Sequence, residues 1–280
     1  MLNSPHDSLI EYKRFSMDSF KWWLSGSEWI MVVQDLINFF THRGEMAPED
    51  GYQVIRHYPR RWIFRYACKD APATQFVVKA FPLKKLRQQI KYRRWGWSEF
   101  NNLLIARERG IPAPYPYAYG EWRHWGLVRM NLVILEDLAP LQDILSLLRE
   151  GTLSASTLFK LLDQISELFG KFYQASCNHI DLSAGNIMVD PEELLMPRPI
   201  DFGYVSFLLK PSLLILVSQT ARFSQSLREW ISLKDFEEWF INLLKKVAPE
   251  ERPEKWWESF KTFYLNEDLS RADRLQLYSG

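Results

Sequence analysis

The sequence predicts an α+β fold, with a small antiparallel sheet in the first half of the chain and a mainly helical second half. Between Gln53 and Ala80, three short segments rich in β-branched and aromatic residues are separated by turn residues, as in antiparallel strands. Residues 155–175 carry apolar side chains at helical spacing, and the chain beyond Pro211 has a mostly helical pattern with recurring tryptophan. With 280 residues, of which 47% are hydrophobic and 25% charged, the chain can bury one large core or two modest ones.

An aromatic-rich segment lies near the start, and we expect residues 1–50 to form a helical extension. Apolar residues recur there at the spacing of an amphipathic helix, at Trp29, Val32, Val33, Leu36, Ile37 and Phe40. Such a helix can lie in a membrane interface, but Asp35 and the small number of flanking cations favour docking on the main domain.

The sheet and the helix that follows it have recognisable boundaries. The predicted strands are "QVIR", "RWIFRY" and "QFVVKA", joined by the turns "HYP" and "KDAPAT". Residues 97–110, "WSEFNNLLIARERG", predict a helix that Ser98 caps and that Gly110 and Pro112 end. Residues 127–137, "LVRMNLVILED", predict a further strand or a hairpin.

A polar loop follows the predicted helix over residues 155–175. In "NHIDLSAGNIMVD", residues 178–190, an aspartate stands two positions after a histidine, and an asparagine five positions after that aspartate. The apolar run that begins at Ile187 predicts a short buried strand, so these polar side chains lie on the loop that enters it. Loops of this kind carry chemistry more often than packing.

Cysteine usage and hydropathy limit the compartment. Cys68 and Cys177 lie outside any CxxC or Cys/His cluster, so we expect neither a disulfide framework nor a zinc site. No basic, apolar and small-residue signal pattern opens the sequence, and no run approaches the roughly 20 apolar residues of a membrane span. A cytoplasmic location is expected.

The net charge of +1 hides an uneven distribution. Residues 51–97 hold 12 Lys and Arg residues against the single acid Asp70. This excess favours an anionic partner for the segment. A solvated basic face that an acidic face balances after folding is the alternative.

Five sequence pieces, in order, resemble the protein-kinase-like superfamily. They are "FVVK" with Lys79, a helix with Glu99, the connector "ILEDL", the loop "HIDLSAGN" and "IDFG" with Asp201. The resemblance covers about residues 51–210 and implies a two-lobed fold. It divides the chain into an N-terminal helical extension (1–50), an N-lobe with an antiparallel sheet (51–137) and a mainly helical C-lobe (138–280).

The resemblance implies an ATP-dependent phosphotransferase that uses Mg²⁺. Lys79 neutralises α- and β-phosphate oxygens, Glu99 or, less suitably placed, Glu108 fixes that lysine, and Asp181 orients the acceptor hydroxyl. The implied catalytic residues are Asp181 and Lys79, the metal ligands are Asn186 and Asp201, and the nucleotide-binding residues are Lys79, Glu99, Glu136, Leu138, Asn186 and Asp201. His179 is expected to brace the loop by a hydrogen bond.

Each of these residues also has an ordinary structural explanation. Asp181 and Asn186 suit an Asx-turn and a cap, Lys79 suits a strand edge, and Glu99 suits the first turn of a helix. The order and spacing of the five pieces favour the kinase interpretation over these separate explanations.

Three departures from the protein-kinase pattern narrow the activity. Ile180 replaces the usual arginine between His and Asp, so control by loop phosphorylation is not expected. No "APE" follows "DFG", which disfavours a peptide substrate. The glycine-rich loop is replaced by "HYPRRW", in which Arg60 or Arg61 contacts phosphates or forms a solvated turn.

Within the superfamily, "EFNNLLIARERGIPAPYPYAYGE" and "NLVILEDL" resemble the bacterial lipopolysaccharide kinases. That family implies phosphorylation of a Kdo or heptose sugar of the inner core at the cytoplasmic face of the inner membrane. Residues 79–94 hold seven cations and no acid, with Trp95 and Trp97 after them, a pattern suited to an anionic glycolipid and to peripheral contact with an anionic membrane surface. Nucleic acid is not an expected partner. A protein or other small-molecule kinase and an inactive binding scaffold remain alternatives.

Overall fold

The computed structural model describes residues 12–17, 19–42, 52–68, 71–190, 192 and 197–266. The chain divides into two compact units. The first unit comprises residues 1–104 and 114–137, and the second comprises residues 105–113 and 138–280. The first is built on a sheet and the second mainly on helices, which confirms the predicted α+β class.

A seven-stranded antiparallel sheet forms the centre of the first unit, with strand order β1-β2-β6-β7-β5-β4-β3. Its strands are β1 (Lys13–Met17), β2 (Phe20–Leu24), β3 (Tyr52–Tyr58), β4 (Arg61–Cys68), β5 (Ala71–Pro82), β6 (Pro116–His124) and β7 (Leu127–Glu136). The predicted strands correspond to β3, β4, β5 and β7, and the predicted turn "HYP" leads into the β3–β4 connection. The sequence did not predict β6, which pairs with β7.

The prediction that residues 1–50 are a helical extension is wrong for residues 13–17 and 20–24. These residues form β1 and β2, and β2 pairs with β6, so the segment belongs to the sheet. The physical reason is the two-residue alternation in β2, which buries Phe20, Trp22 and Leu24 on one face.

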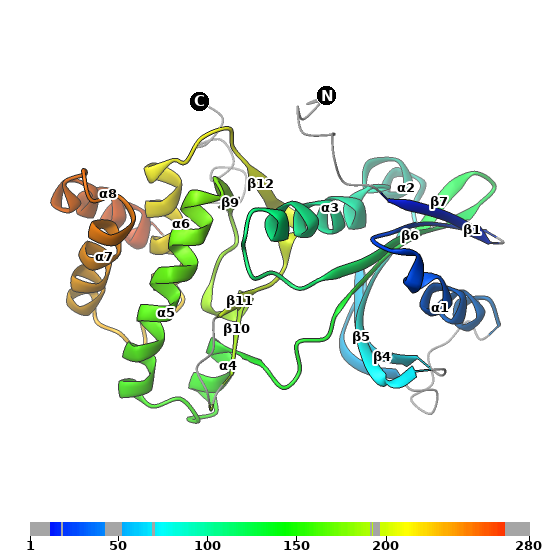
Figure 1. The fold of residues 1–280 in the computed structure, drawn as a ribbon, viewed down its shortest axis with the longest axis horizontal. Coiled ribbons are helices and arrows are strands. Elements are labelled where there is room, and N and C mark those ends of the chain that lie inside the picture. Colours follow the sequence, from blue (N-terminus) through cyan, green and yellow to red (C-terminus); the bar gives the residue numbers. More distant parts are fainter. Residues whose placement is uncertain are drawn as a thin grey trace. The chain divides into compact units, whose positions relative to one another are not determined.

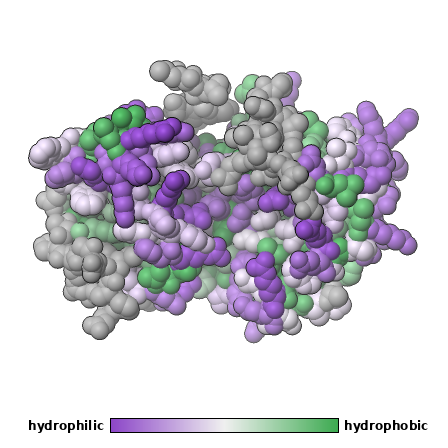
Figure 2. Space-filling model, turned by 180° about the vertical axis from the view of Figure 1, so that it is seen from behind, coloured by the Kyte–Doolittle hydropathy of each residue, from purple (hydrophilic) through white to green (hydrophobic). Residues whose placement is uncertain are grey.

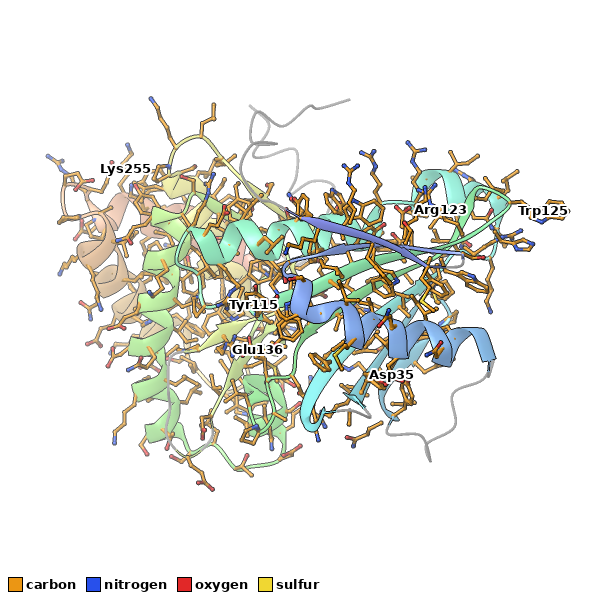
Figure 3. The ribbon with its side chains drawn as sticks, turned by 45° about the vertical axis from the view of Figure 1, so that its right-hand side comes forward. Asp35, Tyr115, Arg123, Trp125, Glu136 and Lys255 are labelled. Atoms are coloured by element: carbon orange, nitrogen blue, oxygen red, sulfur yellow. The ribbon has the colours of Figure 1, made fainter. Side chains whose placement is uncertain are left out.

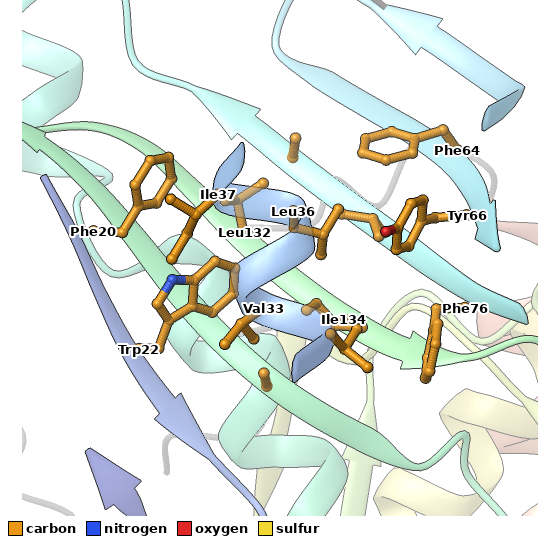
Figure 4. Close-up of a cluster of buried hydrophobic side chains, with 14 of the residues drawn as sticks. Phe20, Trp22, Val33, Leu36, Ile37, Phe64, Tyr66, Phe76, Leu132 and Ile134 are labelled. Carbon is orange, nitrogen blue, oxygen red and sulfur yellow. The ribbon is translucent and has the colours of Figure 1, made fainter. Parts of the chain in front are cut away.

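The amphipathic helix predicted in the same segment is confirmed as α1 (Ile30–His42), which follows a short 3₁₀ turn, η1 (Ser27–Trp29). Its buried residues pack on the sheet, as predicted, and Figure 4 shows Val33, Leu36 and Ile37 among aromatic side chains of β2, β4 and β5. This cluster is the core of the first unit: Phe20, Trp22, Leu24, Val32, Val33, Leu36, Ile37, Tyr52, Phe64, Tyr66, Phe76, Val78, Ala80, Ala118, Met130, Leu132 and Ile134.

Two helices follow β5, namely α2 (Leu86–Lys91) and α3 (Trp95–Glu108). In Figure 1, α1 and α3 lie on opposite sides of the sheet. The predicted N-cap at Ser98 is wrong, because α3 begins at Trp95 and the Ser98 hydroxyl donates to the Arg94 carbonyl one turn earlier at 3.3 Å. The predicted stop is confirmed, since Gly110 adopts a φ of 80°, where a side chain would be strained.

The second unit is mainly helical, as predicted. Its helices are α4 (Ile144–Arg149), α5 (Ala155–Gln174), α6 (Leu213–Gln225), α7 (Leu233–Val247) and α8 (Pro253–Leu265). Ser154 and Ser232 accept hydrogen bonds from the third residue beyond them and cap α5 and α7. Every apolar position predicted for the α5 core is buried: Leu158, Leu161, Leu162, Ile165, Leu168, Phe169 and Phe172.

Five short strands support the polar loop of this unit. They are β8 (Gln142–Asp143), β9 (Cys177–His179), β10 (Ile187–Val189), β11 (Arg198–Pro199) and β12 (Val205–Phe207). β10 pairs with β11 and β8, and β9 pairs with β12, all antiparallel. The 3₁₀ turns η3 (Ala184–Asn186) and η4 (Phe202–Tyr204) adjoin these strands. The short strand predicted after Asn186 is confirmed as β10.

Within the described part of the chain, no helix combines the length and the hydrophobicity that crossing a membrane requires. On the face drawn in Figure 2, hydrophilic residues cover most of the described surface, and hydrophobic residues appear as small separate patches. Cys177 is a free, buried cysteine, and the side chain of Cys68 is outside the described residues. Burial raises the pKa of the Cys177 thiol, which keeps it protonated.

Candidate functional site

Lys79 and Glu99 form a buried ion pair in the first unit. Val78 and Ala80 on β5 face the α1 cluster, so the alternation of the strand turns Lys79 to the opposite face, toward α3. The Lys79 and Glu99 residues are 7% and 2% exposed. The pairing expected from the sequence is therefore present, whereas Glu108 lies exposed at the end of α3.

A close approach of α3 to the sheet makes this pair geometrically possible. A Cβ atom on Gly96 would lie 3.1 Å from side-chain atoms of Asn131 and Val133 and 3.2 Å from the Tyr119 ring. The Tyr119 hydroxyl lies 2.9 Å from both the Glu121 carboxylate and the Asn131 side-chain oxygen. Burial, with the Glu121 carboxylate second, raises the pKa of Tyr119, so the phenol stays neutral. Sequence reasoning missed this network, whose members are isolated polar residues on strands.

The second unit brings Asp181, Asn186 and Asp201 onto one loop system. Asn186 directly precedes β10, and Asp201 is the second residue after β11. Because β10 and β11 are antiparallel, the start of one and the end of the other lie at the same edge. The Ile200 amide donates to the Asn186 carbonyl at 2.9 Å and joins the two segments there. The sequence predicted these residues as neighbours, and the structure brings them together.

Asn186 is held in a defined orientation. Its side-chain Nδ2 donates to the main-chain oxygen of Asp181 at 2.9 Å. Since a carbonyl only accepts hydrogen bonds, the amide nitrogen must point to Asp181, and the side-chain oxygen points away from it. Among the described residues, none donates a hydrogen bond to that oxygen. It is therefore available to a cation.

Asp201 adopts a left-handed backbone conformation, with φ 66° and ψ 58°. Aspartate tolerates this region better than most side chains, and strain at a polar residue is typical of functional sites. The residue marks the sharp change of direction between β11 and η4.

His179 braces this turn, as the sequence predicted. Its Nε2 lies 3.0 Å from the Ile200 carbonyl, so Nε2 carries the proton and donates. Its ring also contacts the Phe202 ring edge-on, with centroids 5.2 Å apart. Burial lowers the pKa of His179, although Asp201 and Asp181 act in the opposite direction. A neutral imidazole therefore fixes the residue that precedes Asp201.

The connector residues Glu136 and Leu138 lie at the end of β7 and directly beyond it. The Glu136 carboxylate accepts from the Tyr115 amide at 2.9 Å, and Figure 3 shows these two side chains close together. The neighbouring Asp137 forms an ion pair with Arg65 of β4. Leu138 is buried, and its carbonyl accepts from the Leu141 amide at 2.8 Å. These contacts hold the main chain of the connector.

The donor set of Asn186 and Asp201 fits Mg²⁺. An amide oxygen and a carboxylate are hard ligands, and Mg²⁺ usually takes one or two protein oxygens and completes its shell with water and phosphate. Within the described residues, no group of three or more His, Cys, Asp and Glu side chains could hold a metal ion.

The predicted basic stretch ends in α2 and the turn after it. Its charged side chains beyond Lys79 are exposed, and so are two apolar residues of α2, Leu86 at 59% and Ile90 at 64%. The exposed cations are Lys84, Lys85, Arg87, Lys91, Arg93 and Arg94. Trp95 stacks on Phe81, and Trp97 contacts Tyr119, so each of these tryptophans has ring contacts within the unit. Both tryptophans are half-buried, and their contribution to a lipid-facing surface stays a prediction.

Comparison with known proteins agrees with this site. Residues 84–202 match the model of the lipopolysaccharide kinase (Kdo/WaaP) family. A 3-deoxy-D-manno-octulosonic acid kinase from Vibrio vulnificus (strain YJ016) is 28% identical over 146 residues, which are 51% of this chain and 52% of the relative. The kinase of the same name from Vibrio cholerae serotype O1 is 29% identical over 109 residues, 39% of this chain and 44% of the relative. The chain thus spans about half the length of the curated relatives it matches.

A solved structure, "WaaP in complex with acyl carrier protein", shares the fold. It is 16% identical, has a TM-score of 0.50, and the match covers 76% of this chain and 88% of that one. The family match includes Glu99, Glu136, Asp181, Asn186 and Asp201, while Lys79 lies just before it. Through residues 84–202, the chain is therefore similar to the lipopolysaccharide kinase (Kdo/WaaP) family.

Proposed function

We propose that this protein is an ATP-dependent phosphotransferase that phosphorylates a sugar hydroxyl of the lipopolysaccharide inner core, with Kdo as the preferred acceptor. The observation that carries the proposal is the placement of Asn186 and Asp201 at one edge of the β10–β11 ladder, with Asp181 bound to Asn186. The curated relatives are named as Kdo kinases, which supports Kdo over heptose.

The proposed mechanism gives each side chain one task. Lys79 neutralises phosphate oxygens of ATP, and Glu99 holds the ammonium group in place through their buried ion pair. Asp181 accepts the proton of the sugar hydroxyl. At the same time, the hydroxyl oxygen forms a bond to the γ-phosphorus, and the bond between the γ-phosphorus and the bridging oxygen of the leaving ADP breaks. Glu136 and Leu138, in the braced connector, contribute to nucleotide binding.

Asn186 and Asp201 would hold Mg²⁺ through their side-chain oxygens. The ion would supply positive charge against the phosphates of the nucleotide. The His179 hydrogen bond to Ile200 and the Asn186 hydrogen bond to Asp181 limit the movement of both ligands before the nucleotide binds. Such preorganisation lowers the entropy lost when the reactants are aligned.

We further propose that α2 lies against an anionic membrane surface at the cytoplasmic face. Exposed Leu86 and Ile90 are one helical turn apart and are flanked by cations, which suits a lipid interface. Trp125, 91% exposed, projects from the β6–β7 hairpin in Figure 3 and offers a second apolar contact.

The test is transfer of labelled γ-phosphate from Mg·ATP to Kdo-containing and heptose-containing acceptors by the purified protein. Asp201→Asn serves as the inactive variant, because asparagine tolerates the left-handed backbone of Asp201 but removes the charge. Asp201→Ala is a second variant. The wild type should transfer label to the Kdo acceptor. Both Asp201 variants should lose this transfer and keep the circular dichroism spectrum of the wild type. Wild-type turnover in a folded Asp201 variant would overturn the proposal.

A further inference from the structure

A pocket with three cations lies in the first unit, and neither Lys79 nor Glu99 is among its described lining residues. It has a volume of about 280 Å³ and is lined by Arg60, Lys85, Arg87, Gln88 and Tyr92. Arg60 comes from the β3–β4 turn, and the other four come from the segment of α2 and its ends. None of the described lining residues is acidic.

The fold brings the β3–β4 turn and α2 to the same end of the β4–β5 ladder. In the β4–β5 ladder, Trp62 pairs with Ala80, so Arg60 and Pro82 both lie just beyond that pair at the same edge. The chain then passes through Leu83, whose amide donates to the Arg129 carbonyl at 2.7 Å. Buried Gln89 donates to the Leu83 carbonyl at 2.9 Å and fixes α2 to this edge.

One wall of the pocket is preformed. The Tyr92 ring contacts Trp95 at a centroid distance of 5.1 Å, and Trp95 stacks on buried Phe81 of β5 at 5.9 Å. At the start of α2, the Lys85 amide donates to the Gln88 side-chain oxygen at 3.0 Å. Because the side-chain oxygen of Gln88 accepts this hydrogen bond, its side-chain nitrogen can donate to a ligand in the pocket.

Among the described residues, the three cations lack the compensation that a structural role would provide. Across the part of the chain that the structure describes, no carboxylate forms an ion pair with Arg60, Lys85 or Arg87. Like charges held together repel one another, so their convergence on one pocket is unfavourable until an anion binds. Guanidinium groups suit an oxyanion especially well, because they donate two parallel hydrogen bonds.

We propose that this pocket binds a phosphoryl group. Its volume of about 280 Å³ is just below the range of about 300–1,000 Å³ typical of ligand pockets, so it suits one charged group with part of its carrier. Two guanidinium groups, an ammonium, an amide and a phenol can surround the oxygens of a phosphate monoester. The phosphate belongs either to a phosphorylated sugar acceptor or to the nucleotide. The assignment to the acceptor rests on the proposed function, whereas the pocket itself does not require turnover.

The experiment compares two double variants of the full chain by isothermal titration with inorganic phosphate. Arg60→Gln with Arg87→Gln removes two charges from the pocket. Lys84→Gln with Arg93→Gln removes two exposed charges from the same segment outside it. We expect the pocket variant to weaken phosphate binding by about tenfold or more and the control variant by less than about twofold. All four side chains are exposed, and equal thermal unfolding midpoints will verify the fold.

Further titrations distinguish the source of the phosphate. Glucose 6-phosphate should bind and glucose should not, and the pocket variant should lose this preference. Phosphate binding that persists at saturating Mg·ATP assigns the pocket to the acceptor, whereas competition assigns it to the nucleotide. Equal weakening in both double variants, or no phosphate binding by the wild type, would overturn the phosphoryl site. Because no step requires catalysis, this result is independent of the phosphotransferase test.

Discussion

The side-chain amide of Asn186 donates to the main-chain oxygen of Asp181 at 2.9 Å. This hydrogen bond closes the loop between the proposed base and the proposed metal ligand without using either the Asp181 carboxylate or the Asn186 side-chain oxygen. The contact uses the main chain of Asp181 and the side-chain nitrogen of Asn186, so the Asp181 carboxylate and the Asn186 side-chain oxygen take no part in it. Changes to the Asp181 side chain can therefore be made without loss of the contact.

Asp181→Asn tests the role of the carboxylate. The main-chain hydrogen bond to Asn186 remains, so the loop should keep its conformation, while the proton acceptor is lost. We expect the transfer rate to fall by about 10²–10⁴-fold, with Mg·ATP affinity nearly unchanged. Single-turnover rates and equilibrium nucleotide binding measure the two quantities. Asp190→Asn, in the same segment, is the matched control and should keep the wild-type rate. A parallel loss of Mg·ATP binding in Asp181→Asn would indicate a structural role.

The Lys79–Glu99 pair should affect stability and activity differently. Lys79→Met or Glu99→Leu leaves one buried charge without its partner, and such changes cost about 3–5 kcal/mol. The double variant removes both charges, so its free energy of unfolding should lie closer to the wild type than the sum of the single effects predicts. Its activity should stay lost, because the phosphate-binding ammonium is absent. Urea unfolding and transfer assays on the four proteins complete the cycle. Additive effects on stability would show that the pair is not coupled.

The sequence predicted correctly those elements whose determining residues lie close together along the chain. The α5 core positions follow from period 3.6, and the strand after Asn186 follows from a short apolar run behind polar residues. The spacing of Asp181, Asn186 and Asp201 was informative for the same reason, since a tight loop and one β-ladder connect them.

The sequence did not predict strands that are stabilised by pairing with segments far away along the chain. β2 is stabilised by β6, about 100 positions later, and its five residues adjoin a longer and stronger helical pattern. β6 itself contains Pro116 and Gly120, which weaken a strand signal, and its pairing with β7 compensates. The pocket joins Arg60 to Lys85 and Arg87 across a turn and a helix. The sequence suggested a phosphate contact or a solvated turn for Arg60 and an anionic partner for the basic stretch, but it did not predict that these residues line one pocket.

The buried His179 predicts a pH dependence of stability. Burial lowers its folded-state pKa below the unfolded value of about 6.5, so the unfolded state binds the proton more readily. The free energy of unfolding should therefore fall as the pH decreases below about 6.5, by at most about 1.4 kcal/mol per pH unit from this group. The charged groups that face it, Asp201 and Asp181, reduce this effect.

Urea unfolding of His179→Asn between about pH 7.5 and 5.5 isolates this contribution. The variant should be less stable at every pH, since the hydrogen bond to Ile200 is lost, but its stability should change less with pH than that of the wild type. His124→Asn, at an exposed histidine, should keep the wild-type slope. Parallel curves for the wild type and His179→Asn would contradict the prediction.

Recruitment to an anionic membrane should depend on the exposed cations around α2 that lie outside the phosphate pocket. Replacing Lys84, Lys91, Arg93 and Arg94 with Gln removes four of them, each worth about 1 kcal/mol near an anionic surface, so binding to phosphatidylserine vesicles should weaken by roughly 10²–10³-fold. The apparent KM for a lipid-linked acceptor should rise and its salt dependence should flatten, with Mg·ATP binding unchanged. A variant with Gln at exposed Lys210, Lys234, Lys245 and Lys255 carries the same charge change in the second unit and should bind vesicles like the wild type. Leu86→Ser with Ile90→Ser should weaken vesicle binding by an amount that salt does not change, because apolar contacts are not screened.

If the variant with Gln at Lys84, Lys91, Arg93 and Arg94 binds vesicles like the wild type, these cations are an ordinary solvated face. That result would favour a water-soluble acceptor.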